Sequence, residues 1–362
     1  MKDDHSARSA TGHEDNRSVA QAYANQVDYC RSNDATITAR IVTAIADLLD
    51  EPNPGAFIAR IRNWPNKPLG DAVPLRSAGG IHALHLSGRA PELAPIYAGE
   101  PADDRAIMAR AVRDHEAFLM PWLDGPPQTN EAGRSWGFAA AMLWLAGEGL
   151  PPNFECLEIG SSAGINLMLD RYAYDLGGVK VGPAEAVMRF TPEWRGKSPP
   201  DRAITIASVK GCDVAPIDLT VPEQAIRLKA YTWPEHTVRF ERLEAAIEAA
   251  KVKKPDLVRM NAADFVEQQL ALPQAEGTTR MLMHSIVWQY VPEDQQARII
   301  AAMAAWGAKA TPDRALAWVE LEADRTLLGH GLRVRYWPGG EEPRLIAAAH
   351  AHGAWAEWFD AA

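Results

Sequence analysis

The sequence predicts an α/β protein in which an all-helical region precedes a mostly parallel β-sheet. In the first 150 residues, apolar side chains recur at a spacing of three to four, the period of an amphipathic helix. Between residues 153 and 321, short strand-like runs alternate with helical patterns, which is typical of a parallel sheet. Two further runs flank Pro338-Gly339-Gly340 and predict an antiparallel C-terminal strand pair.

Composition limits the class of protein. The chain has 362 residues, of which 47% are hydrophobic and 23% charged, as in globular proteins. Its 37 basic and 47 acidic residues give a net charge of −10, which argues against nucleic acid as a partner. No apolar run is long enough to span a membrane, and no secretory signal follows the start. We therefore expect a cytoplasmic protein that does not interact with membranes.

The predicted elements divide the chain into three parts. Residues 1–18 are polar and aperiodic, and we expect a disordered tail there. Residues 19–150 form the predicted helical N-terminal cap, and residues 151–362 form the predicted sheet domain. Weak alternation around two adjacent glycines predicts a hairpin-like insertion at about 172–200.

A glycine-containing loop is the most informative feature. A strand-like run ends at Ile159 and a predicted helix covers Ile165 to Arg171. The loop between them consists of Gly160, Ser161, Ser162, Ala163 and Gly164. Glycine allows a sharp turn and a close approach to a ligand, and the following helix would present unpaired N–H groups. The plain alternative is a tight turn that binds nothing.

Three ligand chemistries compete for this loop. A dinucleotide site needs Gly-x-Gly-x-x-Gly, which is absent. A serine hydrolase needs Gly-x-Ser-x-Gly, which is present, with Ser162 as nucleophile and Asp264 and His352 in a suitable chain order. However, no His-Gly-Gly-Gly element is present to form an oxyanion hole. The loop is also similar to the S-adenosylmethionine loop of Rossmann-like methyltransferases, in which Glu158 would be the leading acid and Ser162 replaces the middle glycine.

Two later acids fit that third interpretation. Asp213 ends a strand-like run, where a carboxylate would accept hydrogen bonds from both ribose hydroxyls. Glu193 is the rival acid if the second strand is instead 186–192. Asp264 follows the next strand, where it would accept a hydrogen bond from the adenine amino group. The alternative role of Asp264 is to cap a helix.

The fourth predicted strand ends near His284 and Ser285. Open α/β sheets bind ligands beyond the carboxyl ends of their strands, so we expect both residues at the site of transfer. A neutral histidine there could remove a proton from the methyl acceptor. A buried, hydrogen-bonded structural histidine is the alternative.

From about Gly79 onward, the chain resembles a bacterial family called domain of unknown function 2332. The motifs that carry the resemblance are Gln128 to Arg134, Glu158 to Leu167, Asp170 to Tyr172, Gly211 to Asp218, His284 to Tyr290 and His352 to Trp355. One departure is Ala215, where we expect asparagine. The resemblance implies a Rossmann-like methyltransferase core and a cofactor pocket that includes Asn166, but it implies no substrate.

The resemblance also implies a role for the polar segment from Gln128 to Arg134. Folded over the pocket, Glu131 would reach the ammonium group of the cofactor's methionine and Arg134 its carboxylate. A solvated loop with a helix cap is the alternative. 

The favoured hypothesis is an S-adenosylmethionine-dependent methyltransferase with a small-molecule acceptor and no metal. The alternatives are a serine hydrolase using Ser162 and a cofactor-binding protein without chemistry. The sequence leaves the acceptor and the oligomeric state open.

Overall fold

The computed structural model describes residues 18–359, so all of the predicted tail except Ser18 lies outside the described residues. Within that range, the chain forms two compact units. The first contains residues up to 129 together with 221–241, and the second contains residues 130–220 and those from 242 onward. No helix between residues 18 and 359 is both long and apolar enough to cross a membrane.

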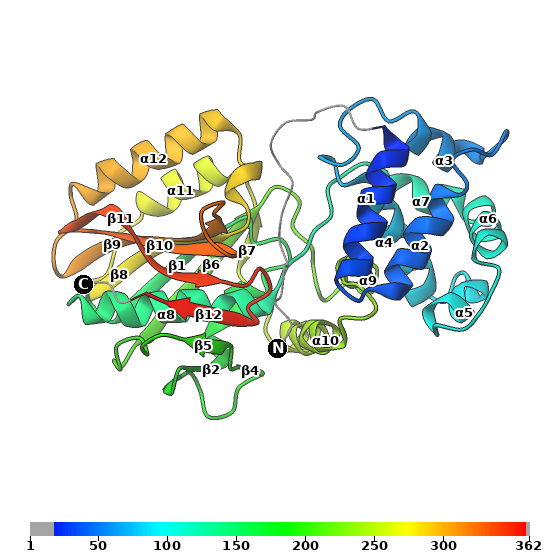
Figure 1. The fold of residues 1–362 in the computed structure, drawn as a ribbon. Helices are drawn as coiled ribbons and strands as arrows, with labels where there is room; N and C mark the ends of the chain where they lie inside the picture. The colour runs from blue at the N-terminus through cyan, green and yellow to red at the C-terminus, as the bar shows by residue number, and fades with distance from the viewer. Residues whose placement is uncertain (1–17, 360–362) are drawn as a thin grey trace. The chain divides into compact units, whose positions relative to one another are not determined.

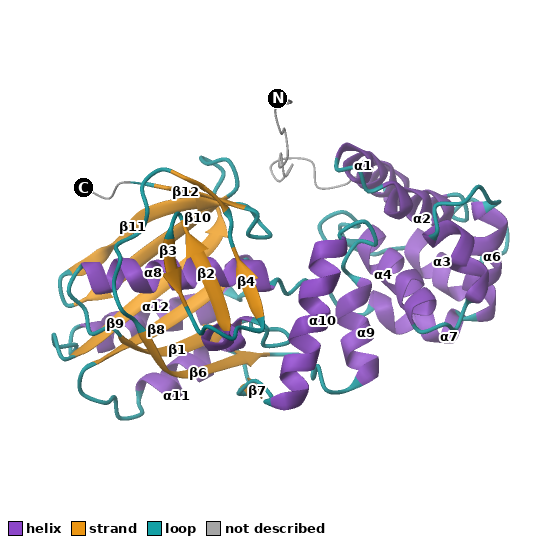
Figure 2. Cartoon of the chain, turned by 90° about the horizontal axis from the view of Figure 1, so that it is seen from below, coloured by secondary structure: helices purple, strands orange, loops and turns teal. Residues whose placement is uncertain are grey.

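The first unit is built from helices (Figure 2). They are α1 (Val19–Ser32), α2 (Thr36–Ala46), α3 (Gly55–Arg62), α4 (Val73–Leu86), α5 (Ala94–Tyr97), α6 (Asp104–Asp114), α7 (Glu116–Leu119) and α9 (Pro222–Ala230). Their apolar faces enclose a core that includes Tyr23, Ile41, Ile45 and Ile58. Most of these helices are amphipathic or short, and α4 is buried on nearly all sides, so packing against neighbours is what stabilises them.

The second unit contains a nine-stranded sheet in the order β5-β12-β11-β10-β9-β8-β1-β6-β7. Its parallel part consists of β1 (Asn153–Ile159), β6 (Thr205–Asp213), β7 (Leu257–Arg259), β8 (Thr278–Ser285) and β9 (Arg314–Ala323). The first of these strands, β1, lies between β6 and β8. The chain therefore reverses its direction of winding at β1, and ligands of open α/β sheets bind outside the carboxyl ends of the strands at such a point.

The far side of the sheet is mainly antiparallel. It contains β10 (His330–Trp337), β11 (Gly340–Ala349), β12 (Trp355–Trp358) and β5 (Glu193–Arg195). Strands β9, β10, β11 and β12 pair antiparallel in that order, and β5 pairs parallel with β12 at the edge. The sheet is consequently mixed, with most of its strand pairs parallel.

Helices cover both faces of the large sheet (Figure 1). On one face lie α11 (Ala262–Leu270) and α12 (Glu293–Gly307), whose buried Phe265 and Ile299 pack with Leu157 of β1. On the other face lies α8 (Ser135–Gly147), which is apolar on all sides and buried along most of its length. The remaining helix, α10 (Thr237–Val252), belongs to the second unit from Arg242 onward.

The segment after the glycine-containing loop differs from the prediction in one respect. Instead of a regular α-helix over 165–171, a six-residue 3-10 helix covers Asn166–Arg171. A small sheet follows, in which β2 (Tyr172–Leu176) pairs antiparallel with β3 (Val179–Val181) and parallel with β4 (Met188–Phe190). The second parallel strand is β6, which ends at Asp213, whereas Glu193 lies in the edge strand β5. Asp213 is therefore the acid beside β1.

Candidate functional site

The loop after β1 depends on glycine for reasons of packing. Gly160 and Gly164 have φ angles of 67° and 72°, in the region that favours glycine. A Cβ atom at Gly160 would overlap the side chain of Val287, and one at Gly164 would lie 2.9 Å from Cβ of Pro255. Neighbouring segments thus pack closely against this loop. This packing explains the two glycines without a bound ligand.

Asp213 holds the middle of the loop. Its Oδ2 accepts a hydrogen bond from the backbone N–H of Ser162 at 2.8 Å, and its Oδ1 accepts one from Ala215 at 2.8 Å. The Ser162 carbonyl accepts from the backbone N–H of Ile217 at 3.0 Å. A carboxylate offers about four lone-pair positions, so Asp213 keeps capacity for further donors.

Glu158 is a buried carboxyl group at the carboxyl end of β1. Its side chain is 2% exposed, and Oε1 accepts a hydrogen bond from Asn166 Nδ2 at 3.0 Å. Burial raises the pKa of Glu158 to about 7; hydrogen bonds from Asn166 and Ser161 oppose this, Asp213 adds to it, and the charge of Arg134 lowers it. A cation bound beside Glu158 would favour the charged carboxylate.

Four buried polar atoms around this loop have no hydrogen-bond partner within residues 18–359. They are Asn130 Oδ1, Glu158 Oε2, Ser162 Oγ and Asn166 Oδ1. We call these residues the polar cluster. Asn130 donates through Nδ2 to the carbonyl of Ser161 at 2.6 Å, which ties it to the loop. Because buried polar atoms almost always have partners, the cluster marks a place where a polar ligand would be stabilised.

Glu131 and Arg134 lie on the segment that Asn130 attaches to the loop. Oε1 of Glu131 accepts from the backbone N–H of Gly133 at 3.0 Å and lies 3.5 Å from Arg242 Nη1. Arg134 is 6% exposed, and its Nε donates to the carbonyl of Ala351 at 2.9 Å. Arg134 is close enough to influence Glu158 electrostatically, whereas Glu131 serves the start of a 3-10 helix.

His284 is enclosed by hydrogen bonds. Its side chain is fully buried, Nδ1 lies 2.7 Å from Glu322 Oε1, and Nε2 lies 2.9 Å from Trp318 Nε1. An indole N–H can only donate, so Nε2 is the acceptor and Nδ1 carries the hydrogen that Glu322 accepts. The ring also stacks on Trp288 with centroids 5.2 Å apart. In this arrangement, neither ring nitrogen of His284 has a free lone pair that could take a proton from a methyl acceptor, unless the hydrogen bond from Trp318 breaks.

The two remaining predicted residues lie at the same edge of the sheet. Ser285 is the last residue of β8 and is 9% exposed. Asp264 lies in the first turn of α11, where Asn261 caps the helix and accepts the Asp264 N–H at 2.9 Å. Its half-exposed carboxylate pairs with Arg298 at 2.7 Å, which lowers the pKa of Asp264. The contacts of Asp264 are therefore those of a helix terminus.

A family model described as "Uncharacterized protein conserved in bacteria (DUF2332)" matches residues 20–358. The chain belongs to this family. No curated protein and no solved structure matches it. The match to DUF2332 spans nearly all of the described residues, including the loop after β1 and the polar cluster. The family description names no activity.

Sequence reasoning missed two residues of this DUF2332 chain that contact His284. Glu322, near the carboxyl end of β9, accepts hydrogen bonds from His284, from the N–H of Val287 at 3.1 Å and from the N–H of Trp288 at 3.3 Å. Trp318 completes the enclosure of His284 from the same strand. An acid at the end of a predicted strand was the available signal for Glu322, as it was for Asp213.

The geometry gives little support to a serine hydrolase or to a metal site. Ser162 Oγ has no hydrogen-bond partner within the described part of the chain, so no histidine there is placed to activate it. The same residues contain no group of three or more His, Cys, Asp or Glu side chains arranged to hold a metal ion.

Proposed function

We propose that the protein is an S-adenosylmethionine-dependent methyltransferase acting on a small-molecule acceptor. The observation that carries this proposal is the polar cluster, whose buried atoms lie around the loop after β1 and have no hydrogen-bond partner among residues 18–359. The strand order β7-β6-β1-β8-β9 supports it, because it puts that loop where α/β sheets bind ligands. 

The residues around the loop suit the charges of this cofactor. Glu158 offers a carboxylate oxygen to a cationic group, and Asp213 keeps lone pairs for hydroxyl donors. Arg134 supplies a buried positive charge near Glu158, which complements a carboxylate. The carboxylates of Asp264 and Glu131 are engaged with other groups of the chain, so the proposal does not rest on these two residues.

The chemistry assigned to the chain is mainly positioning. When bound, S-adenosylmethionine supplies an electrophilic methyl group. Holding donor and acceptor in line accounts for much of the acceleration of such bimolecular reactions. Glu158 and Asp213 would hold the donor, while Ser285 at the end of β8 would face the acceptor. His284 would take the acceptor's proton only after the Trp318 hydrogen bond opens.

Calorimetry with purified protein tests the cofactor. Glu158→Gln and Asp213→Asn should each weaken S-adenosylmethionine binding by about tenfold to a hundredfold, because each loses a charge-assisted hydrogen bond. Glu276→Gln removes an exposed carboxylate elsewhere and should bind like the parent. Parent-like affinity in both site variants would show that the cofactor assignment is wrong.

A cofactor-binding protein without chemistry is the second candidate, because His284 has both ring nitrogens engaged. Incubation with methyl-labelled cofactor and a bacterial small-molecule extract separates the two candidates. Labelled products that are lost in Glu158→Gln and Asp213→Asn would support the methyltransferase. Tight cofactor binding without any labelled product would favour the binding protein.

A further inference from the structure

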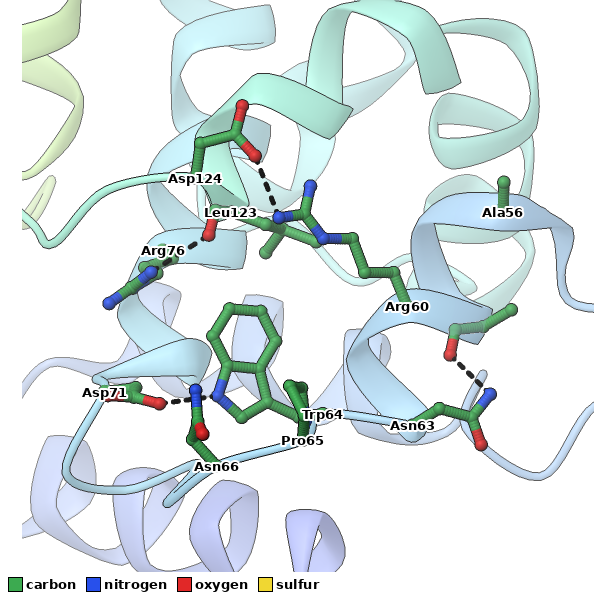
Figure 3. Close-up of a pocket in the computed structure, with 11 residues that line it drawn as sticks. Ala56, Arg60, Asn63, Trp64, Pro65, Asn66, Asp71, Arg76, Leu123 and Asp124 are labelled. Carbon is green, nitrogen blue, oxygen red and sulfur yellow. Dashed lines mark hydrogen bonds and ion pairs between the residues drawn. The ribbon is translucent and has the colours of Figure 1, made fainter.

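The first unit contains a cavity of about 700 Å³ that the site described above does not include. It lies between α3, the start of α4 and the loop that joins them, and the chain near Leu123 completes it (Figure 3). Cavities of this size hold small organic molecules. The polar side chains that line it include Arg60, Asn63, Trp64, Asn66, Asp71, Arg76 and Asp124.

Arg76 is a buried cation that forms no ion pair with any carboxylate of residues 18–359. The residue is 8% exposed, and its one hydrogen bond within residues 18–359 runs from Nη1 to the carbonyl of Leu123 at 2.9 Å. Its Nε is buried and donates to no atom of the described chain, and no carboxylate there forms an ion pair with it. Burial lowers the pKa of Arg76, and the negative charges of Asp71 and Asp124 oppose this only in part. A buried charge is unfavourable unless a partner compensates it, so this guanidinium favours an anion.

The two carboxylates that line the cavity are already engaged. Asp71 accepts a hydrogen bond from the indole N–H of Trp64 at 2.7 Å, and Asp124 accepts one from Arg60 at 2.8 Å. The guanidinium carbons of Arg76 and Arg60 lie 5.3 Å and 6.0 Å from the centre of the Trp64 ring. Figure 3 shows these side chains gathered around the indole. The cavity thus combines a buried, incompletely neutralised cation with a flat aromatic wall.

We propose that this cavity binds an organic carboxylate. The carboxylate would pair with Arg76, whose planar guanidinium matches its geometry, and the apolar body would lie against Trp64 and Pro65. The proposal is independent of the methyltransferase assignment, because every residue that carries it belongs to the first unit.

Nuclear magnetic resonance of the full chain with ¹⁵N-labelled indole groups tests this site, with sodium benzoate as the probe. Trp64→Phe identifies the Trp64 signal. Benzoate, added while sodium chloride keeps the ionic strength constant, should shift that signal saturably. Sodium chloride added alone should not. Arg76→Lys keeps the charge but loses the planar fork, and it should weaken benzoate binding by about tenfold. Arg89→Gln removes a cation that lies over Phe118 instead, and it should bind benzoate like the parent.

A second pair of variants covers the case in which Arg76→Lys does not fold. Asn66 is exposed at the cavity, so Asn66→Asp should fold and repel benzoate, weakening its binding several-fold at low salt, whereas Asn66→Ser should not. The proposal is wrong if benzoate gives no saturable shift of the Trp64 signal, or if Asn66→Asp binds it like the parent. Tighter binding of inorganic phosphate than of benzoate would also overturn the assignment to a carboxylate.

Discussion

Glu158 makes the stability of the second unit depend on pH. Its pKa is about 7 in the folded chain against 4.5 when exposed, so the folded state binds this proton more tightly than the unfolded state. The free energy of unfolding should therefore fall as pH rises from 4.5 to about 7 and stay level above that. The total fall should be roughly 3 kcal/mol at most. Urea denaturation of the parent and Glu158→Gln between about pH 5 and pH 8 measures this. Equal pH dependence in both proteins would contradict the prediction.

Substitutions at Ser162 distinguish the contribution of its backbone from that of its hydroxyl group. Its φ of 53° is unfavourable for any residue with a Cβ atom, by about 1–2 kcal/mol. Ser162→Gly relieves this, and the greater flexibility of unfolded glycine offsets part of the gain, so stability should rise by up to about 1 kcal/mol. Thermal denaturation and cofactor calorimetry are the measurements.

The matched control for that change is Ser162→Ala, which keeps the Cβ atom and loses the hydroxyl. Under the methyltransferase proposal, both variants should retain most cofactor affinity, because the Ser162 backbone contacts Asp213 and Ile217. Esterase activity in the parent that disappears in both variants would instead establish Ser162 as a nucleophile.

At the scale of elements, the sequence predicts what local patterns determine. The apolar run of β1 and the glycines that follow it define a strand and its loop, and the acid at the end of β6 follows from the same logic. The short 3-10 helix after the loop was not predictable. Its hydrogen bonds join residues three apart, such as that from the Leu167 N–H to the Gly164 carbonyl at 3.1 Å, and the spacing of apolar residues does not distinguish this from an α-helix.

The surroundings of His284 show the same limit. Position at the end of a strand predicted a base, but the groups that engage both ring nitrogens come from β9, the next strand in the sheet. Without that pairing register, the sequence does not reveal that Trp318 and Glu322 meet His284. The structure thus adds to the sequence mainly where two strands exchange side-chain contacts.

These contacts predict that His284 stabilises the β8–β9 pair. His284→Ala would create a cavity and leave the Trp318 indole N–H and a Glu322 oxygen without this partner, so unfolding should become easier by about 2–4 kcal/mol. Chemical denaturation measures the change, and Ser285→Ala is the neighbouring control. A His284→Ala protein as stable as the parent that has lost turnover would instead identify His284 as the base.

At the scale of the whole molecule, the two units are interleaved along the chain. The segment 221–241 leaves the second unit and returns to it, and α9 within it packs in the first unit. Leu228 and Tyr231 are buried there, and Tyr231 lies against Gly79 of α4. The polar cluster, by contrast, belongs wholly to the second unit. The sequence predicted a helical part and a sheet part, but not this return, because no local pattern marks which unit a helix joins.

Because of this interleaving, we expect one substitution, Leu228→Lys, to help a fragment of the chain and to harm the full chain. A fragment of residues 130–362 lacks α4, so the apolar face of α9 that includes Leu228 would be exposed and should promote aggregation. Leu228→Lys should therefore make the fragment more soluble, yet destabilise the full chain by several kcal/mol, on the order of 2–5, because it places a charge in a packed core. Light scattering of the fragment and denaturation of the full chain measure the two effects. Glu223→Lys, in the exposed first turn of the same helix, is the control and should leave the full chain's stability nearly unchanged. A Leu228→Lys substitution that leaves the full chain as stable as the parent would contradict the assignment of α9 to the first unit.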